Sequence, residues 1–167
     1  LFGISPSTSG TVRMEGKPVV IRNTRDAIRN GIAYVPEDRL TQGLFFGQSI
    51  GMNIVIAAID KYRSGLAIKR QPMKTDIEKW IRDLNVATSS YEPYIQTLSG
   101  GNQQKVVLAK WLNSDPKLLI LNGPTVGVDV GSKSDIHNIL QSLAAKGIGI
   151  IIISDDWQEA QSQNQIS

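Results

Sequence analysis

Cysteine is absent from the sequence, and histidine occurs once, at position 137. The lack of thiols excludes disulfides and thiolate metal sites, and it is compatible with a reducing cytoplasm. One imidazole is too few for a multi-histidine metal site. Long apolar runs are also missing. One of the longest, residues 148 to 153, has the length of a strand and falls far short of the roughly 18 residues that a membrane span requires.

A strong excess of one charge is missing as well. Eighteen basic and 15 acidic residues leave a formal net charge of +3, and no dense lysine or arginine stripe occurs. Nucleic-acid binding is therefore not predicted. The 167 residues are 41% hydrophobic and 20% charged, which is typical of one globular domain with a hydrophobic core. The chain opens at Leu1 with no start methionine and no basic leader, which predicts a piece of a larger protein.

The first third of the chain predicts a hairpin, a short helix and a strand. Residues 12 to 21 alternate in polarity on either side of a turn at Glu15-Gly16-Lys17, as hairpin strands do. A helix is expected over residues 24 to 30. A compact strand then covers residues 32 to 35, and Pro36 closes it.

The middle of the chain, from Gly43 to Tyr94, is irregular and predominantly helical in pattern. Its clearest helix is predicted to begin at Thr75, because Thr75 and Glu78 have the spacing of a capping box. The apolar positions that follow at i, i+3, i+4 and i+7 spacing are Ile77, Trp80, Ile81 and Leu84. This region is therefore interpreted as a helical insert between two strand-bearing regions.

The last third alternates helix and strand. Helices are expected over residues 102 to 112 and 132 to 146, and strands buried on both faces over residues 118 to 121 and 150 to 153. A strand–helix–strand succession implies parallel strands with a right-handed crossover. The predicted parts of this single α/β domain are a β/core fragment at 1–42, a helical subdomain at 43–96 and an α/β core at 97–167.

Ser99, Gly100 and Gly101 stand directly before the helix at 102 to 112. The first amides of a helix have no intrahelical acceptors, and the helix dipole makes that end partly positive, so an anion could bind there. Alternatively, Ser99 only caps the helix while the two glycines form a turn. On these three residues alone, the second interpretation is favoured.

The longer strings carry a resemblance. "LSGGNQQKVVLAKWL", followed five residues later by "KLLILNGPTVGVD", resembles the ATP-binding subunits of ABC transporters. The closer resemblance is to the second nucleotide-binding domain of the sugar-importer group, the ribose, galactose, xylose and arabinose type. Residues 9 to 43, including "PEDR", are similar to the same domain. The resemblance implies an ABC-type α/β fold, with a parallel-sheet core like that of P-loop NTPases and an inserted helical subdomain.

The resemblance also implies roles for particular residues. The signature motif, which in the family contacts the γ-phosphate of ATP held by the opposite domain of a head-to-tail pair, would be Ser99, Gly100, Gly101, Asn102 and Gln103. Glu37 stands at the position of the Q-loop glutamine. Asp129 would be the D-loop aspartate near the dimer seam. Without the resemblance, Asp129 is equally well explained as an acid leading the helix at 132 to 146.

Three positions depart from the family pattern. After the strand at 118 to 121, the resemblance implies an aspartate for Mg²⁺ and a glutamate that polarises water, but Asn122 and Gly123 stand there. Losing a positioned base typically costs ~100- to 10,000-fold in rate. Asp155 occupies the switch-histidine position. No catalytic residue is therefore intact, no resident metal site is predicted, and the chain alone is expected to show little or no ATPase activity.

The sequence contains no Walker A pattern, G-x-x-x-x-G-K-[ST]. The resemblance places that segment before Leu1, so the fold is expected to lack it. The nearest match, "GVDVGSKS" at residues 127 to 134, has Ser132 where a glycine must stand and does not directly follow a strand. It is not predicted to be a phosphate-binding loop.

The leading hypothesis is an ATP-binding component of an ABC-type carbohydrate import system, a catalytically degenerate half that supplies the signature motif in trans. It implies that ATP and Mg²⁺ are bound mainly by a partner domain and that permease subunits are further partners. Residues 37 to 53 would couple the nucleotide-binding event to the permease subunits, at the cytoplasmic face of the cell membrane. Exposed sheet edges would cause self-association.

A second hypothesis is a non-catalytic structural or regulatory module without nucleotide contact. Asn122 and Gly123 favour it. The intact glycines of the signature string count against it, because a remnant without nucleotide contact is expected to have no physical need for them.

Overall fold

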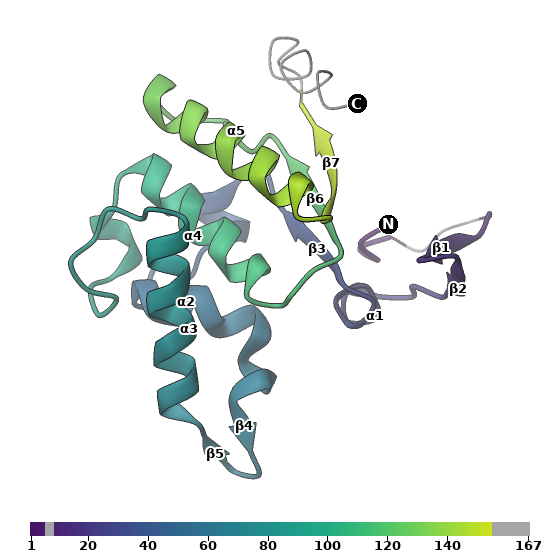
Figure 1. Cartoon of the computed structure of the whole chain (residues 1–167), viewed down its shortest axis with the longest axis horizontal. Coiled ribbons are helices and arrows are strands. Elements are labelled where there is room, and N and C mark those ends of the chain that lie inside the picture. The colour runs from purple at the N-terminus through teal and green to yellow at the C-terminus, as the bar shows by residue number, and fades with distance from the viewer. Residues whose placement is uncertain (6–8, 155–167) are drawn as a thin grey trace.

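Three short parallel strands form the centre of the chain, in the order β3–β6–β7. They are β3 (Ile32–Val35), β6 (Leu118–Asn122) and β7 (Gly149–Ile153). The computed structural model describes residues 1–5 and 9–154. Both strand pairs are parallel, and α5 (Val130–Ala145) connects β6 to β7 (Figure 1). The predicted parallel strand–helix–strand unit is confirmed.

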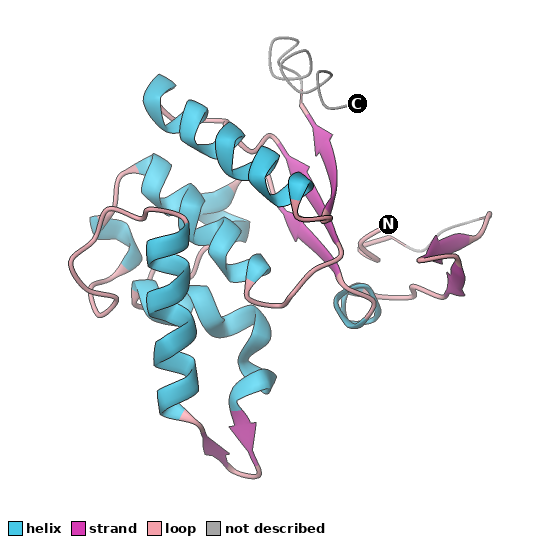
Figure 2. Ribbon diagram, viewed as in Figure 1, coloured by secondary structure: helices cyan, strands magenta, loops and turns pink. Residues whose placement is uncertain are grey.

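The two faces of this sheet enter different cores. Alternate residues such as Ala33 and Leu119 enter the larger core, which contains side chains from the helices of the middle region and from α5. Ile32 and Ile120 enter a smaller core with Ala27 of α1 (Thr24–Arg29). Figure 2 shows most of the helices on one side of the sheet, and the short helix α1 with the N-terminal hairpin on the other.

The prediction that the last strand is buried on both faces is wrong. Ile151 is 37% exposed and Ile153 51% exposed, whereas Ile150 and Ile152 pack against the larger core. The smaller core takes residues from β3 and β6 but none from β7. One face of β7 therefore stays uncovered in the described part of the chain.

The N-terminal hairpin has the predicted form. β1 (Val12–Met14) pairs antiparallel with β2 (Lys17–Val19). Glu15 and Gly16 between them both have positive φ, at 50° and 77°, as a two-residue turn between antiparallel strands requires. Phe2 stacks on Tyr34 with ring centroids 5.3 Å apart, which ties the start of the chain to β3.

The middle region is mainly helical, as predicted. It contains a π-helical turn, η1 (Arg39–Gly43), then α2 (Ile50–Val55), η2 (Ile56–Tyr62), α3 (Arg70–Asp83) and the short η3 (Ile95–Thr97). Between η2 and α3 lies a small hairpin that was not predicted, made of β4 (Arg63–Ser64) and β5 (Ala67–Ile68).

The predicted start of the main middle helix is wrong. The helix α3 begins at Arg70, five residues before Thr75. Thr75 lies inside it, and its hydroxyl donates to the carbonyl of Gln71 at 3.1 Å. Pro72 fits the first turn because amides there have no intrahelical acceptor. A proline in the first turn therefore belongs to the helix, and no capping box starts it.

Helix α4 (Gly100–Leu112) connects the parts of the chain. It contacts α2, α3 and η2 as well as β3 and α5. Helix α4 follows the predicted boundary at residue 96 but packs on helices that precede it. The predicted boundaries after residues 42 and 96 therefore stay predictions. No helix in residues 1–5 and 9–154 combines the length and the apolar character needed to cross a membrane.

Candidate functional site

The N-terminal end of α4 is open to solvent. Ser99 is exposed and extended in conformation, and the first intrahelical bond runs from the Gln103 amide to the Ser99 carbonyl at 2.9 Å. Gly100 and Gly101 already belong to the helix and form no turn. The Ser99 hydroxyl caps no amide and instead accepts from Asn102 Nδ2 at 3.0 Å. Ser99 therefore occupies the N-cap position, as the alternative predicted, but its side chain makes no cap hydrogen bond and the predicted glycine turn is wrong.

The amide of Gly100 has no acceptor within residues 1–5 and 9–154, as expected for the first position of a helix. Gly100 is partly exposed, whereas Gly101 is buried. The donors that an outside anion can reach are therefore concentrated at Ser99 and Gly100, at the positive end of the helix dipole.

The other two predicted signature residues make contacts within the chain. The Asn102 side-chain oxygen accepts from the Ala87 amide at 2.8 Å. Gln103, which is 8% exposed, donates through Nε2 to the Leu98 carbonyl at 3.1 Å. Both side chains hold the loop between α3 and α4 against α4, so they stabilise the conformation of the backbone around the site.

Gly101 is packed too closely for a side chain, whereas a side chain at Gly100 would meet the guanidinium end of Arg39. A Cβ on Gly101 would lie 2.1 Å from Ser132 Oγ of α5, and one on Gly100 would lie 2.8 Å from Nη2 of Arg39. Gly101 is thus needed for packing within the chain. The expectation that a remnant without nucleotide contact has no use for the glycines is therefore wrong for Gly101.

A groove lies beside this end of α4. It has a volume of about 480 Å³, and its lining residues include Glu37, Asp38, Arg39, Asn122 and Gly127. The structure therefore brings the predicted Q-loop position, Glu37, to the same groove as Asn122. The carboxylate of Asp38 is occupied, because it accepts from the Thr41 hydroxyl at 2.6 Å and from the Leu40 and Thr41 amides. The Thr41 hydrogen bonds lower the pKa of Asp38.

Gly123 turns the chain sharply at the end of β6. Its φ is +53°, and its amide donates to the Ile153 carbonyl at 2.7 Å. A Cβ here would stand 2.8 Å from Val126 Cγ2 and 3.0 Å from Glu37 Cγ. The backbone conformation and its surroundings both suit glycine, so the position has no space for the glutamate of the family pattern.

Asp129 occupies the N-cap of α5. Its carboxylate accepts from the Ser132 amide at 2.9 Å, and hydrogen bonds from Ser132 lower the pKa of the carboxyl. The interpretation as a helix-leading acid is therefore confirmed, and a place at a dimer seam stays a prediction. Asp155, the predicted switch position, lies outside the described residues.

Two basic residues that contact the segment from 39 to 43 or its surroundings were missed, one of them, Arg39, in the lining of the groove. The Arg39 guanidinium donates to the carbonyls of Val126 and Gly127 at 2.8 and 3.0 Å. Lys110, which is 5% exposed, donates to the Gly43 carbonyl at 2.6 Å. Both hold the segment from 39 to 43 in place. Arg39 stands in the "PEDR" string, which was the only signal available for it.

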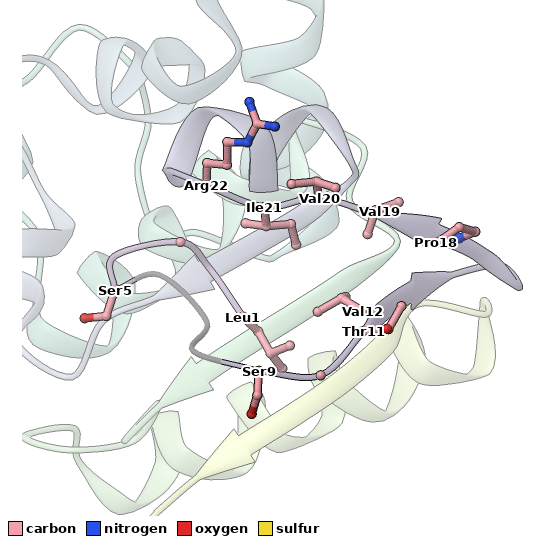
Figure 3. Close-up of a pocket in the computed structure, with 12 residues that line it drawn as sticks. Leu1, Ser5, Ser9, Thr11, Val12, Pro18, Val19, Val20, Ile21 and Arg22 are labelled. Atoms are coloured by element: carbon pink, nitrogen blue, oxygen red, sulfur yellow. The ribbon is translucent and has the colours of Figure 1, made fainter.

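A larger hollow, about 1020 Å³, lies between the first residues and the β1–β2 hairpin. Figure 3 shows its lining, which is mostly aliphatic and backbone, with Arg22 as the one charged residue. None of the predicted site residues borders it. Among the described residues its polar side chains are Ser5, Ser9, Thr11 and Arg22, and Figure 3 shows Ser5, Ser9 and Arg22 pointing in different directions, so they do not converge as a phosphate site would require.

The profile of the ABC transporter family matches residues 1–126. The chain belongs to this family. A putative ribose/galactose/methyl galactoside import ATP-binding protein of Rhizobium etli is 45% identical over 159 residues, 95% of this chain and 30% of that protein. The ribose import ATP-binding protein RbsA of Clostridium perfringens is 42% identical over 160 residues, 95% of this chain and 32% of that protein. The chain thus spans about a third of the length of these curated relatives.

Solved structures agree with the fold of this ABC transporter chain. An ATP-binding cassette of an ABC transporter has a TM-score of 0.75 and 25% identity, covering 92% of this chain and 62% of its own. A dimeric cassette in a post-hydrolysis state, bound to ADP and Pi, has a TM-score of 0.75 and 18% identity, covering 95% and 68%. The ABC-type α/β fold, with a parallel sheet and helices packed on it, is confirmed.

Mg²⁺ is the metal that ATP chemistry in this family implies, and the groove fits it poorly. It offers the Glu37 carboxylate and the neutral side chain of Asn122, while both Asp38 oxygens accept hydrogen bonds and Gly123 has no side chain. Mg²⁺ relies on carboxylates together with phosphate oxygens and water. No set of three or more His, Asp or Glu residues in the described ranges is arranged to hold an ion. These residues do not form a resident metal site.

Proposed function

We propose that this chain is an ATP-binding component of a carbohydrate import system, and that its Ser99–Gly100 end closes on ATP carried by a second nucleotide-binding domain. The open end of α4 carries the proposal, because the Gly100 amide lacks an acceptor in the described chain and the Ser99 hydroxyl is exposed. Such a helix end attracts phosphate oxygens. The names of the Rhizobium etli and Clostridium perfringens relatives supply the carbohydrate class.

In this proposal the partner domain carries out most of the nucleotide chemistry. Gly123 can neither orient nor deprotonate a water, and the groove does not form a Mg²⁺ site of its own. ATP and Mg²⁺ are therefore held mainly by the partner, and turnover by this chain alone is negligible. Permease subunits at the cytoplasmic face of the membrane receive the signal through residues 37 to 53, among which Glu37, Leu40 and Phe45 are exposed.

The test is calorimetry of ATP binding to the chain, to a partner nucleotide-binding domain, and to the mixture. Binding should be tighter in the mixture, because the α4 end adds donors to the phosphates. Ser99→Arg should abolish the gain by filling the approach to Gly100, whereas Ser142→Arg, at an exposed position of α5, should leave it intact. A mixture no tighter than the partner alone contradicts the proposal.

A second candidate function is a structural module without nucleotide contact. The packing of Gly101 against Ser132 favours it, because this packing requires a glycine without any ligand. The same calorimetry separates the candidates. Unchanged ATP affinity on mixing, together with stable association of the two domains, supports the structural module.

A further inference from the structure

Arg39 connects three segments that are distant in the sequence. It lies in η1, after the exposed residues Glu37 and Asp38. Its Nη1 and Nη2 donate to the carbonyls of Val126 and Gly127 at 2.8 and 3.0 Å, across 87 and 88 residues. On another side, Nη2 is so close to Gly100 that a Cβ there would lie 2.8 Å away. One side chain thus contacts the groove, the loop after β6 and the end of α4.

The two hydrogen bonds fit an arginine side chain better than a lysine side chain. Two adjacent carbonyls match the planar fork of a guanidinium, whereas an ammonium is a point donor that bonds them less well. The neighbouring Asp38 is occupied by residues 40 and 41. Arg39 forms no salt bridge with any described carboxylate, and its Nε is buried without a partner there. Keeping a partly buried cation without a carboxylate partner costs free energy.

We propose that Arg39 is a positioning residue that couples the groove to the Ser99–Gly100 end of α4. By holding Val126 and Gly127 against Gly100, it makes the 37–39 segment, the loop after β6 and the end of α4 move together. Asp129 caps α5 two residues after Gly127, so the start of α5 follows the same movement. A contact that displaces the exposed residues Glu37 or Asp38 therefore shifts the donors offered to ATP. The ATP part of this inference rests on the proposed function.

The first test is hydrogen exchange of the purified chain. Arg39→Ala and Arg39→Lys should speed exchange at least about tenfold at the hydrogen-bonded amides of two segments, Gly123, Val126 and Val128 in the loop after β6 and Gln103 in α4, because the anchoring donors are lost or halved. Arg82→Ala, at an exposed position of α3 whose side chain makes no described hydrogen bond, is the control and should leave both segments unchanged. Unaltered exchange at the α4 end in both Arg39 variants overturns the inference.

The second test is a double-mutant cycle on stability. Gly100→Ala should raise the unfolding constant of the wild-type chain about tenfold, because the new methyl group meets the guanidinium. In an Arg39→Ala background the nearest remaining atom is the Gly127 carbonyl oxygen at 3.3 Å, so the effect should nearly disappear. Equal effects in both backgrounds show that Arg39 does not restrain Gly100, and they overturn the inference.

The third test measures ATP-dependent association with a partner nucleotide-binding domain. Arg39→Lys should weaken association about tenfold while the midpoint of global unfolding stays within experimental error of the wild type, which a purely structural role would not produce. If the wild type associates and both Arg39 variants associate equally well, the inference is overturned. If the wild type never associates but the first two tests succeed, the proposed function fails and the mechanical coupling by Arg39 stands.

Discussion

At the scale of single residues, Gly123 is the position where the family pattern has a glutamate. Replacing it with glutamate supplies the carboxylate of the family pattern. It also places a Cβ at φ +53°, 2.8 Å from Val126. Backbone strain of this kind costs about 1–3 kcal/mol. We predict that Gly123→Glu lowers the melting temperature and gives no measurable increase in ATP turnover, even with a partner domain present.

The matched control is Gly47→Glu, because Gly47 has no positive φ and no atom within 4 Å of a Cβ. It should leave the melting temperature nearly unchanged, within about 0.5 kcal/mol of the wild-type stability. A Gly123→Glu variant that is as stable as this control and hydrolyses ATP would show that the turn after β6 adapts to a side chain.

Lys110 makes stability depend on pH in the alkaline range. Burial lowers its pKa to about 8, from the ordinary 10.5. Between these values the unfolded chain binds more protons than the folded chain, so raising the pH favours folding by up to about 1.4 kcal/mol per pH unit. Below pH 8 the lysine is protonated in both states, so its contribution to the free energy of unfolding does not change with pH. Neutral lysine still donates, so its hydrogen bond to the Gly43 carbonyl survives.

Urea denaturation at pH 7.5 and 9.5 checks this prediction. The wild-type chain should gain stability relative to Lys110→Met, which cannot titrate there. A Lys146→Met control, at an exposed position after α5, should keep the wild-type dependence. If the wild type and Lys110→Met change equally between the two pH values, the buried lysine does not titrate in this window.

At the scale of elements, one asparagine holds three helices together. Asn113, fully buried after the end of α4, accepts at Oδ1 from Trp80 Nε1 of α3 at 3.1 Å. The same oxygen lies 2.9 Å from the hydroxyl of Tyr62 in η2, whose single proton it shares with the Asp76 carboxylate at 2.8 Å. Asn113→Ala leaves the Trp80 donor without an acceptor, which costs about 1–3 kcal/mol. Chemical denaturation should show this loss, and Asn138→Ala, exposed on α5, should show almost none.

The elements themselves were largely predictable from local patterns. Apolar runs bounded by proline or glycine predicted β3 and β6, and i, i+3, i+4 spacing predicted α5. The start of α3 was missed because the capping-box spacing at Thr75 and Glu78 recurs inside helices, where Thr75 bonds the preceding turn. The exposure of β7 was missed because its isoleucines cannot indicate which face another segment covers.

At the scale of the whole molecule, the site depends on contacts that no local pattern contains. Ser99 and Gly100 were predicted from their string, and the structure leaves them at an open helix end. The bonds from Arg39 to Val126 and Gly127 join residues 87 and 88 apart. A single sequence carries no trace of such pairing. Neither the contacts of Arg39 nor its close approach to Gly100 could therefore be inferred.

Self-association is the remaining prediction at this scale. In the described sheet β7 is an edge strand, with Ile151 and Ile153 exposed by 37% and 51%. Uncharged edge strands with an apolar face pair readily with other chains. We expect the mass measured by light scattering to rise with concentration, and Ile151→Lys/Ile153→Lys to return it to the monomer. Leu66→Lys, at a fully exposed turn between β4 and β5, should keep the wild-type mass. A wild-type chain that stays monomeric at every concentration rules out association through this edge.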